Sequence, residues 1–429
     1  MFSYTASFDG QESRCPADFS RDAYARGLQQ ERLKAVVTVT AAVFSPCGGY
    51  LVCASDSGRL AVWKLSQHID TDVDAQSSSL PDTTPDVSWR ADSSCINCLT
   101  FARGLLLCGG DESLFGCSWA AIVSALEQGT APPPTSMTSS LREEEGEGVL
   151  RVRCPRKAAG TRARNPEING FCFDETTKRV LCAAGDGNAY EWDLGSLAAA
   201  AGQGRDDFSP VRTYEGGKGY LHAVASAPGA SVVATGSDDG FVGVWDCRVK
   251  DVASGANVVL LRPAHAQTGD GKEASPGGRG GKPDGAECVT SLETGDGGNT
   301  LVCGGRRTGG AVVAGGILEP TVGRGWVNQW NLADLKVTKV ASLPAEVQCM
   351  HVAVQSQTVL VAGAEPILTS LSRSELERKA RTPVTPRSVY ALAVNGTGRH
   401  EGLTCVAGVG PTVEVYTLPG VLAKTLCFL

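Results

Sequence analysis

The cysteines and histidines of this chain are the residues best able to hold a metal ion or to act as nucleophiles. The sequence has 429 residues, with 16 cysteines and five histidines among them. No histidine stands three or four residues from a cysteine or from another histidine. Cys95 and Cys98 form a C-x-x-C pair, but no second pair follows it, and a structural zinc ion takes four ligands. We therefore predict two partly buried thiols at these positions and no metal site.

A glycine-rich segment, GGRGGKPDG at 277–285, has the composition of a phosphate-binding loop. Its spacing does not match that of a nucleotide-binding loop, and Pro283 stands where a serine or threonine would hold magnesium. No nucleophile elbow and no pair of catalytic carboxylates stands out elsewhere in the chain. The sequence therefore predicts no cofactor, no small-molecule substrate and no enzymatic activity.

Residues 151–164 form a basic stretch without an acidic residue. Its side chains could contact RNA phosphates, or the stretch could act as a nuclear import signal. It could equally be a solvated loop that offsets the acidic run before it, and no aromatic residue is interleaved for base stacking. The candidate residues are Arg151, Arg153, Arg156, Lys157, Arg162 and Arg164.

The segment GSDDGFVGVWDCR combines a tight acidic turn with an alternating strand. Ser237 and Asp239 are placed to fix the turn, and Trp245 to fill a hydrophobic layer. Arg248 has no such role, and its planar guanidinium group suits bidentate contact with a carboxylate of a partner. The segment is therefore either one structural unit or a binding site. The partner-binding candidates are Asp246 and Arg248.

The composition of the whole chain limits the kinds of partner. The formal net charge is −7, which argues against a protein that coats nucleic acid by charge alone. No apolar run approaches the roughly 18 residues needed to cross a membrane, so we expect no membrane segment and no signal peptide. The 52 glycines and 21 prolines have no triplet period, which favours short strands joined by tight turns.

The pattern of GSDDGFVGVWDCR recurs along the chain. Each unit has an apolar strand, a short turn, a second strand ending in small residues, an Asp/Gly turn and an alternating third strand. The units span 41–65, 94–119, 167–194, 220–247, 288–332, 347–371 and 389–418. Their third strands end in Trp63, Trp119, Trp192, Trp245, Trp330, Leu371 and Tyr416. Because the segment after each unit can supply a fourth strand, the repeats predict an all-β, seven-bladed WD-repeat β-propeller.

The repeats also divide the chain into regions. Residues 1–35 are expected to form an N-terminal extension with a short helix over 17–34, and 36–429 the propeller. The C-terminal AKTLCFL is predicted to be the fourth strand of the seventh blade. Four ranges interrupt the blades and are expected to be long surface-loop insertions: 66–88, 129–165, 266–287 and 304–324.

Most cysteines lie within the apolar strands of these units. They occur in YLVCAS, LLLCGG, RVLCAAG and TLVCGG, where a thiol behaves as a small hydrophobic group. We expect buried, reduced cysteines, as in a nuclear or cytosolic protein.

Several segments are more specific than the general repeat pattern: SPCGGYL (45–51), NPEING (165–170), WVNQWNL (326–332) and AGAEP (362–366). They resemble the THO complex subunit 6 family, whose members are WD-repeat proteins of the THO/TREX mRNA export machinery. The likeness covers roughly 17–429 apart from the insertions. The resemblance implies a nuclear, non-catalytic scaffold in mRNA processing and export. It implies other THO complex subunits as partners and indirect contact with mRNA.

An alternative is that the chain is a substrate receptor of a cullin-4 RING ubiquitin ligase. The sequence W-D-x-R at the end of a blade resembles the box by which WD-repeat receptors dock on the ligase adaptor. Arg248 would then contact the adaptor from the end of the third strand of its blade. In the other interpretation Trp245 and Asp246 are the ordinary blade signature.

Overall fold

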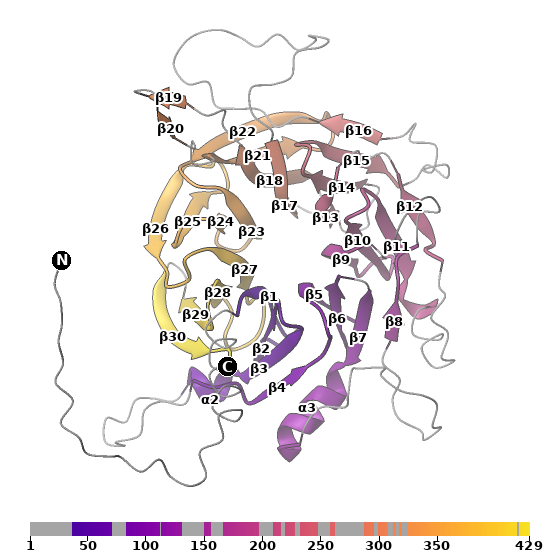
Figure 1. Cartoon of the computed structure of the whole chain (residues 1–429), viewed down its shortest axis with the longest axis vertical. Helices are drawn as coiled ribbons and strands as arrows, with labels where there is room; N and C mark the ends of the chain where they lie inside the picture. The colour runs from indigo at the N-terminus through magenta and orange to yellow at the C-terminus, as the bar shows by residue number, and fades with distance from the viewer. Residues whose placement is uncertain are drawn as a thin grey trace, which may run out of the picture. The chain divides into compact units, whose positions relative to one another are not determined.

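The computed structural model describes residues 37–429 except for 71–82, 112, 131–149, 156–165, 197–208, 216–218, 228–231, 248–257, 262–286, 296–298, 308–311, 315–316, 320–323 and 418–419. Val37–Leu429 is one compact unit, and it contains seven four-stranded antiparallel sheets (Figure 1). The predicted seven-bladed β-propeller is confirmed. The expected helix over 17–34 and most of the expected insertion 266–287 lie outside the described residues. Among the described helices, none combines the length and the apolar character that crossing a membrane requires.

The first four blades follow one another along the chain, and each is built from its own segment. Their strands are, for blade 1, β1 (Val39–Phe44), β2 (Tyr50–Ser55), β3 (Arg59–Lys64) and β4 (Val87–Arg90); for blade 2, β5 (Ile96–Ala102), β6 (Leu105–Gly110), β7 (Leu114–Ser118) and β8 (Leu150–Val152); for blade 3, β9 (Ile168–Asp174), β10 (Arg179–Ala184), β11 (Ala189–Asp193) and β12 (Arg212–Tyr214); for blade 4, β13 (Leu221–Ser226), β14 (Val232–Ser237), β15 (Val242–Asp246) and β16 (Val258–Leu261).

The last three blades have the same order, and blade 5 is interrupted by a small hairpin. Their strands are, for blade 5, β17 (Glu287–Gly295), β18 (Thr300–Arg307), β21 (Arg324–Asn331) and β22 (Lys336–Leu343); for blade 6, β23 (Val347–Ala353), β24 (Thr358–Gly363), β25 (Ile367–Ser372) and β26 (Arg378–Pro383); for blade 7, β27 (Val389–Val394), β28 (Thr404–Gly408), β29 (Thr412–Thr417) and β30 (Val421–Cys427). The hairpin is β19 (Val312–Ala314) with β20 (Ile317–Glu319), and the helices are α2 (Leu65–His68) and α3 (Trp119–Gln128).

The first strand of each blade lies nearest the centre of the ring, and the fourth strand lies outermost (Figure 1). Because β30 is the fourth strand of blade 7, the prediction for the C-terminal segment is confirmed. Within the described residues, no strand is shared between blades 7 and 1. Instead, Gly410 N–H donates to Val37 O and Asn395 Nδ2 donates to Gly48 O, both at 2.9 Å. A hydrophobic cluster that includes Trp63 and residues of β28–β30 packs at the same junction.

The cysteines of the second strands behave as the strand pattern predicts. Cys53, Cys108, Cys182 and Cys303 are all free thiols and fully buried. Each stands in the middle of its second strand, so its side chain packs in the layer between two blades. The interpretation of these residues as small hydrophobic core groups is confirmed.

The predicted tryptophan position is occupied in four blades and not in blade 2. In four blades a buried tryptophan on the third strand pairs with the second residue of the second strand. These tryptophans are Trp63, Trp192, Trp245 and Trp330. In blade 2 the same register position is held by Cys117, which pairs with Leu106. Trp119 lies two residues later, as the first residue of helix α3, so the prediction of its place in the repeat is wrong.

Helix α3 explains how blade 2 tolerates a small residue at this position. The side chain of Ile122, on this helix, is buried between blades 1 and 2 in the hydrophobic cluster that also contains Cys117. Trp119 makes edge contacts with the rings of Tyr50 and Phe101, with centroids 5.5 and 4.9 Å apart. The Ser118 side chain caps the helix by accepting the Ala121 N–H. The helix therefore contributes the bulk that an indole supplies in other blades.

Several ranges expected to be insertions contain strands of the propeller. The range 129–165 includes β8, the fourth strand of blade 2, and 66–88 ends within β4. The range 304–324 includes the end of β18, the hairpin of β19 and β20, and the start of β21. These ranges were predicted to be insertions from their composition alone. The outer strands β4 and β8 are short and pair along one edge only, so composition does not reveal them.

A bulge in the first strand of every blade places one polar or aromatic residue at the junction with the next blade. The register shifts around Thr40, Asn97, Asn169, His222, Thr290, Gln348 and Tyr390. Four of these side chains donate to the carbonyl that precedes the bulge of the next blade. Thr40 donates to Ile96 O, Asn97 to Ile168 O at 3.2 Å, Asn169 to Leu221 O at 2.7 Å, and Thr290 to Val347 O at 2.5 Å. These bonds join successive blades around the centre of the ring.

His222 breaks this series, and replacing it with asparagine is expected to stabilise the protein. Its Nε2 has no hydrogen-bond partner among the described residues, whereas Asn169 at the same position bonds the next blade. In the variant the new amide can donate to Val289 O, which should raise the free energy of unfolding by about 1 kcal/mol. Urea unfolding of both proteins measures the change.

The pH dependence separates this explanation from a general packing effect. Burial lowers the pKa of His222, so the folded protein favours the neutral ring. A group of this kind contributes stability above its ordinary pKa, about 6.5, and that stability is lost as the pH falls through it. The gain from H222N should therefore be larger at pH 5 than at pH 8. An equal gain at both values would contradict the assignment.

Candidate partner-binding site at the end of strand β15

The turn that precedes β15 is held by the two residues expected to fix it. The Ser237 hydroxyl bonds Asp239 Oδ1, and the Phe241 N–H donates to the same carboxylate oxygen at 3.2 Å. Ser237 Oγ also lies 3.3 Å from Phe241 O. These bonds are local to the turn, and the Trp245 Nε1 has no partner among the described residues. Ser237 and Asp239 therefore shape the turn without reaching the indole.

Trp245 is a core residue between blades 3 and 4. It is buried, pairs with Val233 on one side and Val258 on the other, and makes an edge contact with the Tyr214 ring at 5.9 Å. A Cβ at Gly243 would lie 2.4 Å from the indole, so only glycine leaves room for the ring there. The side chain is therefore enclosed and holds the strand in place without facing a partner.

A polar network ties the residues after Trp245 to blade 3. Arg212 Nη1 donates to Cys247 O at 2.7 Å, and its guanidinium group lies over the Tyr214 ring. The Tyr214 hydroxyl donates to Glu191 Oε2 at 2.5 Å and lies 3.4 Å from Cys247 Sγ. Arg179 forms an ion pair with the other oxygen of Glu191. The end of β15 is thus anchored to β12 of the preceding blade, and Tyr214 of β12 is held in turn through Glu191 of β11 and Arg179 of β10.

The sequence did not predict this network. Its members stand on three strands, β10, β11 and β12, and meet only because antiparallel pairing aligns these strands. They are Arg179, Glu191, Arg212 and Tyr214. Burial raises the pKa of Tyr214 well above its ordinary value, with the nearby Cys247 and Glu191 adding to the effect. The phenol therefore remains a neutral donor to Glu191. The network joins strands β10, β11 and β12 to the end of β15.

Of the two partner-binding candidates, the structure describes one. Asp246 is half-buried at the last position of β15 and pairs with Val232. Arg248 lies outside the described residues, so its role in docking stays a prediction. The described part of the segment GSDDGFVGVWDCR is therefore an anchored structural unit of blade 4.

The basic stretch is divided by the structure. Arg151 belongs to β8, where its guanidinium group pairs with Asp92 Oδ2 at 3.0 Å and donates to Ser113 Oγ at 2.9 Å. It also stacks over the Phe115 ring. Arg151 is therefore committed to the junction of blades 1 and 2, while Arg153 is exposed. The remaining candidates, Arg156, Lys157, Arg162 and Arg164, lie outside the described residues.

Replacing Asp92 with asparagine is expected to lower the free energy of unfolding by about 2 kcal/mol at pH 7, because a charged hydrogen bond to Arg151 is lost. Burial opposes ionisation of Asp92, but the Ser94 N–H and the Arg151 charge hold its pKa below the ordinary value. The stability from this group is present above the ordinary aspartate pKa, about 4, and is lost as the pH falls through it. The difference between D92N and the parent should therefore shrink towards about pH 3. The exposed Asp334, in a surface pair with Lys336, provides a control that should show no such trend.

The C-x-x-C pair lies at the start of β5. Burial raises the pKa of Cys95 to about 12 and that of Cys98 further. Cys95 Sγ donates to Asn97 Oδ1 at 3.0 Å, and Cys98 Sγ contacts Ile168 O. Within the described part of the chain, no group of three or more His, Cys, Asp or Glu side chains is arranged to hold a metal ion. The two thiols are partly buried, as predicted.

Comparison with known families places these features in the WD-repeat class. The family model described as "WD domain, G-beta repeat" matches residues 33–64 and 208–246. The second match contains Arg212, Tyr214 and Trp245 and ends at Asp246. The repeat pattern therefore accounts for the anchored unit and stops before Arg248.

Curated relatives extend the likeness beyond the repeats. THO complex subunit 6 of Arabidopsis thaliana is 25% identical over 319 residues, which are 72% of this chain and 67% of that protein. The Danio rerio homologue of THO complex subunit 6 is 21% identical over 386 residues, covering 90% of this chain and 95% of that protein. This chain is similar to THO complex subunit 6 over most of its length. The Mus musculus homologue of THO complex subunit 6 is 24% identical over 213 residues, about half of each chain.

The match to the Danio rerio homologue covers 90% of this chain and 95% of that protein. The general WD model matches only residues 33–64 and 208–246, so the likeness to the THO complex subunit 6 homologue extends well beyond the matched repeats. The resemblance to the THO complex subunit 6 family seen in the sequence is therefore confirmed.

Proposed function

We propose that this chain is a non-catalytic scaffold subunit of the THO complex that acts in nuclear mRNA processing and export. The observation that carries the proposal is the similarity to THO complex subunit 6 over 90% of this chain. Its partners are then other THO complex subunits, with mRNA contacted indirectly. The chain is proposed to work in the nucleus, and no cofactor or small-molecule substrate is required.

The architecture suits a scaffold. Blades joined by buried clusters and by the bulge hydrogen bonds form a rigid ring, so loops at its two ends keep fixed relative positions. Such a ring can present several surfaces to different proteins at once. The anchored end of β15 supports this role, because it fixes the position of Cys247, the residue that precedes Arg248 in the chain.

Affinity purification from nuclear extract tests the proposal. The full chain should recover THO complex subunits, identified by mass spectrometry. Arg248→Ala should recover the same set, because the scaffold role does not require docking through this arginine. Lys250→Ala, two residues later in the sequence, is the matched control.

The cullin-4 alternative predicts a different result in the same experiment. The parent chain and Lys250→Ala would recover the ligase adaptor, and Arg248→Ala would lose it. No described residue favours this alternative, since Arg248 is outside the described part of the chain. Recovery of neither set of proteins would contradict both functions.

A further inference from the structure

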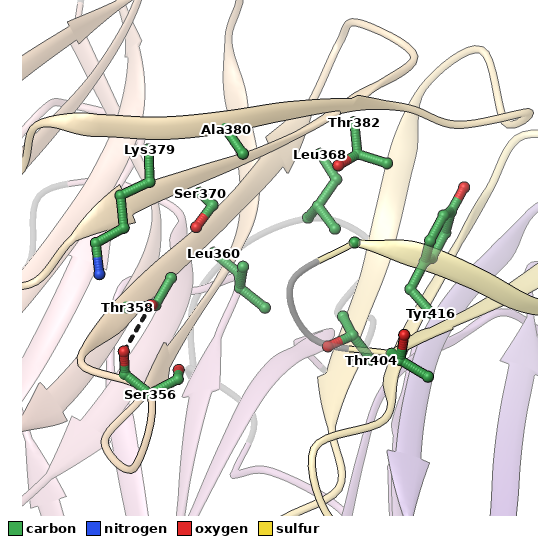
Figure 2. Close-up of a pocket in the computed structure, with 12 residues that line it drawn as sticks. Ser356, Thr358, Leu360, Leu368, Ser370, Lys379, Ala380, Thr382, Thr404 and Tyr416 are labelled. Atoms are coloured by element: carbon green, nitrogen blue, oxygen red, sulfur yellow. Dashed lines mark hydrogen bonds between the residues drawn. The ribbon is translucent and has the colours of Figure 1, made fainter.

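A cavity of about 400 Å³ lies between blades 6 and 7. Figure 2 shows side chains of β24, β25 and β26 on one side of it and of β28 and β29 on the other. Its walls include the apolar side chains Leu360, Leu368 and Tyr416, with hydroxyl groups between them. This volume lies within the roughly 300–1,000 Å³ typical of binding sites.

The cavity occurs where the repeat departs from its own pattern. Tyr416 holds the register position that an indole fills in four other blades. Its hydroxyl donates to Glu414 Oε2 at 2.8 Å and lies 3.3 Å from Pro383 O, which holds the ring at one end of the interblade space. Glu414 is held in turn by the Thr385 N–H at 3.0 Å. The tyrosine is therefore fixed and does not fill the volume.

Thr404, which pairs with Tyr416, is the second departure. The corresponding second-strand residue is apolar in every other blade: Leu51, Leu106, Val180, Val233, Leu301 and Val359. Thr404 is only 1% exposed, lines the cavity, and its hydroxyl has no hydrogen-bond partner among the described residues. A buried hydroxyl of this kind is unfavourable unless another group bonds it.

The surface beside the cavity has the features of a protein-binding edge. Gly420 lines the cavity, and the next two residues, Val421 and Leu422, are 65% and 48% exposed. They begin β30, which pairs with β29 on one side, and no strand of the described residues pairs with its other side. Lys379 is the charged member of the described lining and stands on β26 across the cavity. An edge strand next to a pocket is suited to an extended peptide with one side chain inserted.

We propose that this cavity binds a tyrosine or tryptophan side chain of a partner protein, carried on an extended segment that lies along β30. The ring occupies the apolar space, its O–H or N–H donates to Thr404 Oγ, and a carboxylate of the same segment faces Lys379. A segment is favoured over a small molecule because Val421 and Leu422 extend the apolar surface beyond the cavity. The proposal does not depend on membership of the THO complex.

Selection of short random peptides on the full-length chain tests the proposal. The selected peptides should contain tyrosine or tryptophan, with acidic residues enriched beside it. Ser370→Phe places a ring inside the cavity and should weaken these peptides by about tenfold or more. Ser342→Phe, an exposed position on the outer strand β22, is the matched control and should leave binding unchanged.

A second variant tests the hydrogen bond and does not depend on the folding of the first. Thr404→Val supplies the residue type found at the same position in blade 6 and removes an unbonded hydroxyl, so it should fold. It should weaken tyrosine or tryptophan peptides by about tenfold and leave their phenylalanine counterparts unchanged. The proposal is overturned if no aromatic residue is selected, or if the Ser370 and Thr404 variants bind like the parent. It is also overturned if N-acetyltryptophanamide binds as tightly as the peptides, because the site would then serve a small molecule.

Discussion

Replacing Trp245 with alanine is expected to lower the free energy of unfolding by about 3–5 kcal/mol. The indole is buried between Val233 and Val258 within its sheet and packs on Tyr214 of the preceding blade. Gly243 beneath it has no side chain that could move into the space left behind. Because the cluster belongs to two blades, its loss weakens their junction as well as strand β15 itself.

Urea unfolding followed by circular dichroism measures this change. Val259→Ala, on the outer strand of the same blade and 44% exposed, is the control and should cost less than about 1 kcal/mol. Trp245→Phe should give an intermediate loss, because a smaller ring still fills part of the space. An unchanged transition for Trp245→Ala would refute the assignment of this residue to the core.

Replacing Glu191 with alanine is expected to lower the free energy of unfolding by about 3 kcal/mol, the second large effect. Its buried carboxylate accepts the Tyr214 hydroxyl and pairs with Arg179, so its removal leaves two polar groups without their partner. The cost is below the upper range for a buried pair because Arg179 is partly exposed and can turn to water.

Comparison of two substitutions isolates the role of charge. Glu191→Gln keeps an oxygen that can accept from Tyr214, so it should cost about half as much as the alanine variant. Glu375, which is 54% exposed and pairs with Lys339 at the surface, is the control, and its alanine variant should change stability by less than about 0.5 kcal/mol. If Glu191→Ala and Glu375→Ala lowered the free energy of unfolding equally, the network at β15 would stabilise the protein no more than a surface ion pair does.

Loss of the Glu191 network should also loosen the anchored end of β15. Arg212 holds the Cys247 carbonyl and stacks on Tyr214, whose own position depends on Glu191. Amide hydrogen exchange at Asp246 and Cys247 should therefore be faster in Glu191→Ala than in the parent protein. In the Glu375→Ala control the exchange rates of these two amides should not change.

The repeat pattern of the sequence determined the number of blades, the second-strand cysteines of the core and the place of the tryptophan in four blades. These features depend on neighbours within one blade, where alternation and turn chemistry act over a few residues. Trp119 shows the limit of this logic. It follows a strand of the right composition, but the pairing of Leu106 with Cys117 moves it out of register and into helix α3.

Only the tertiary structure decided what fills the space between blades. The bulge bonds join residues 52 to 71 positions apart in the chain, as in Asn169 with Leu221 and Asn97 with Ile168. The basic residue Arg151 proved to be paired with Asp92, 59 positions away. The cavity beside Thr404 depends on a tyrosine held by a neighbouring blade, while α3 replaces an indole elsewhere. Local composition cannot report such contacts, because each depends on which side chains the closed ring brings together.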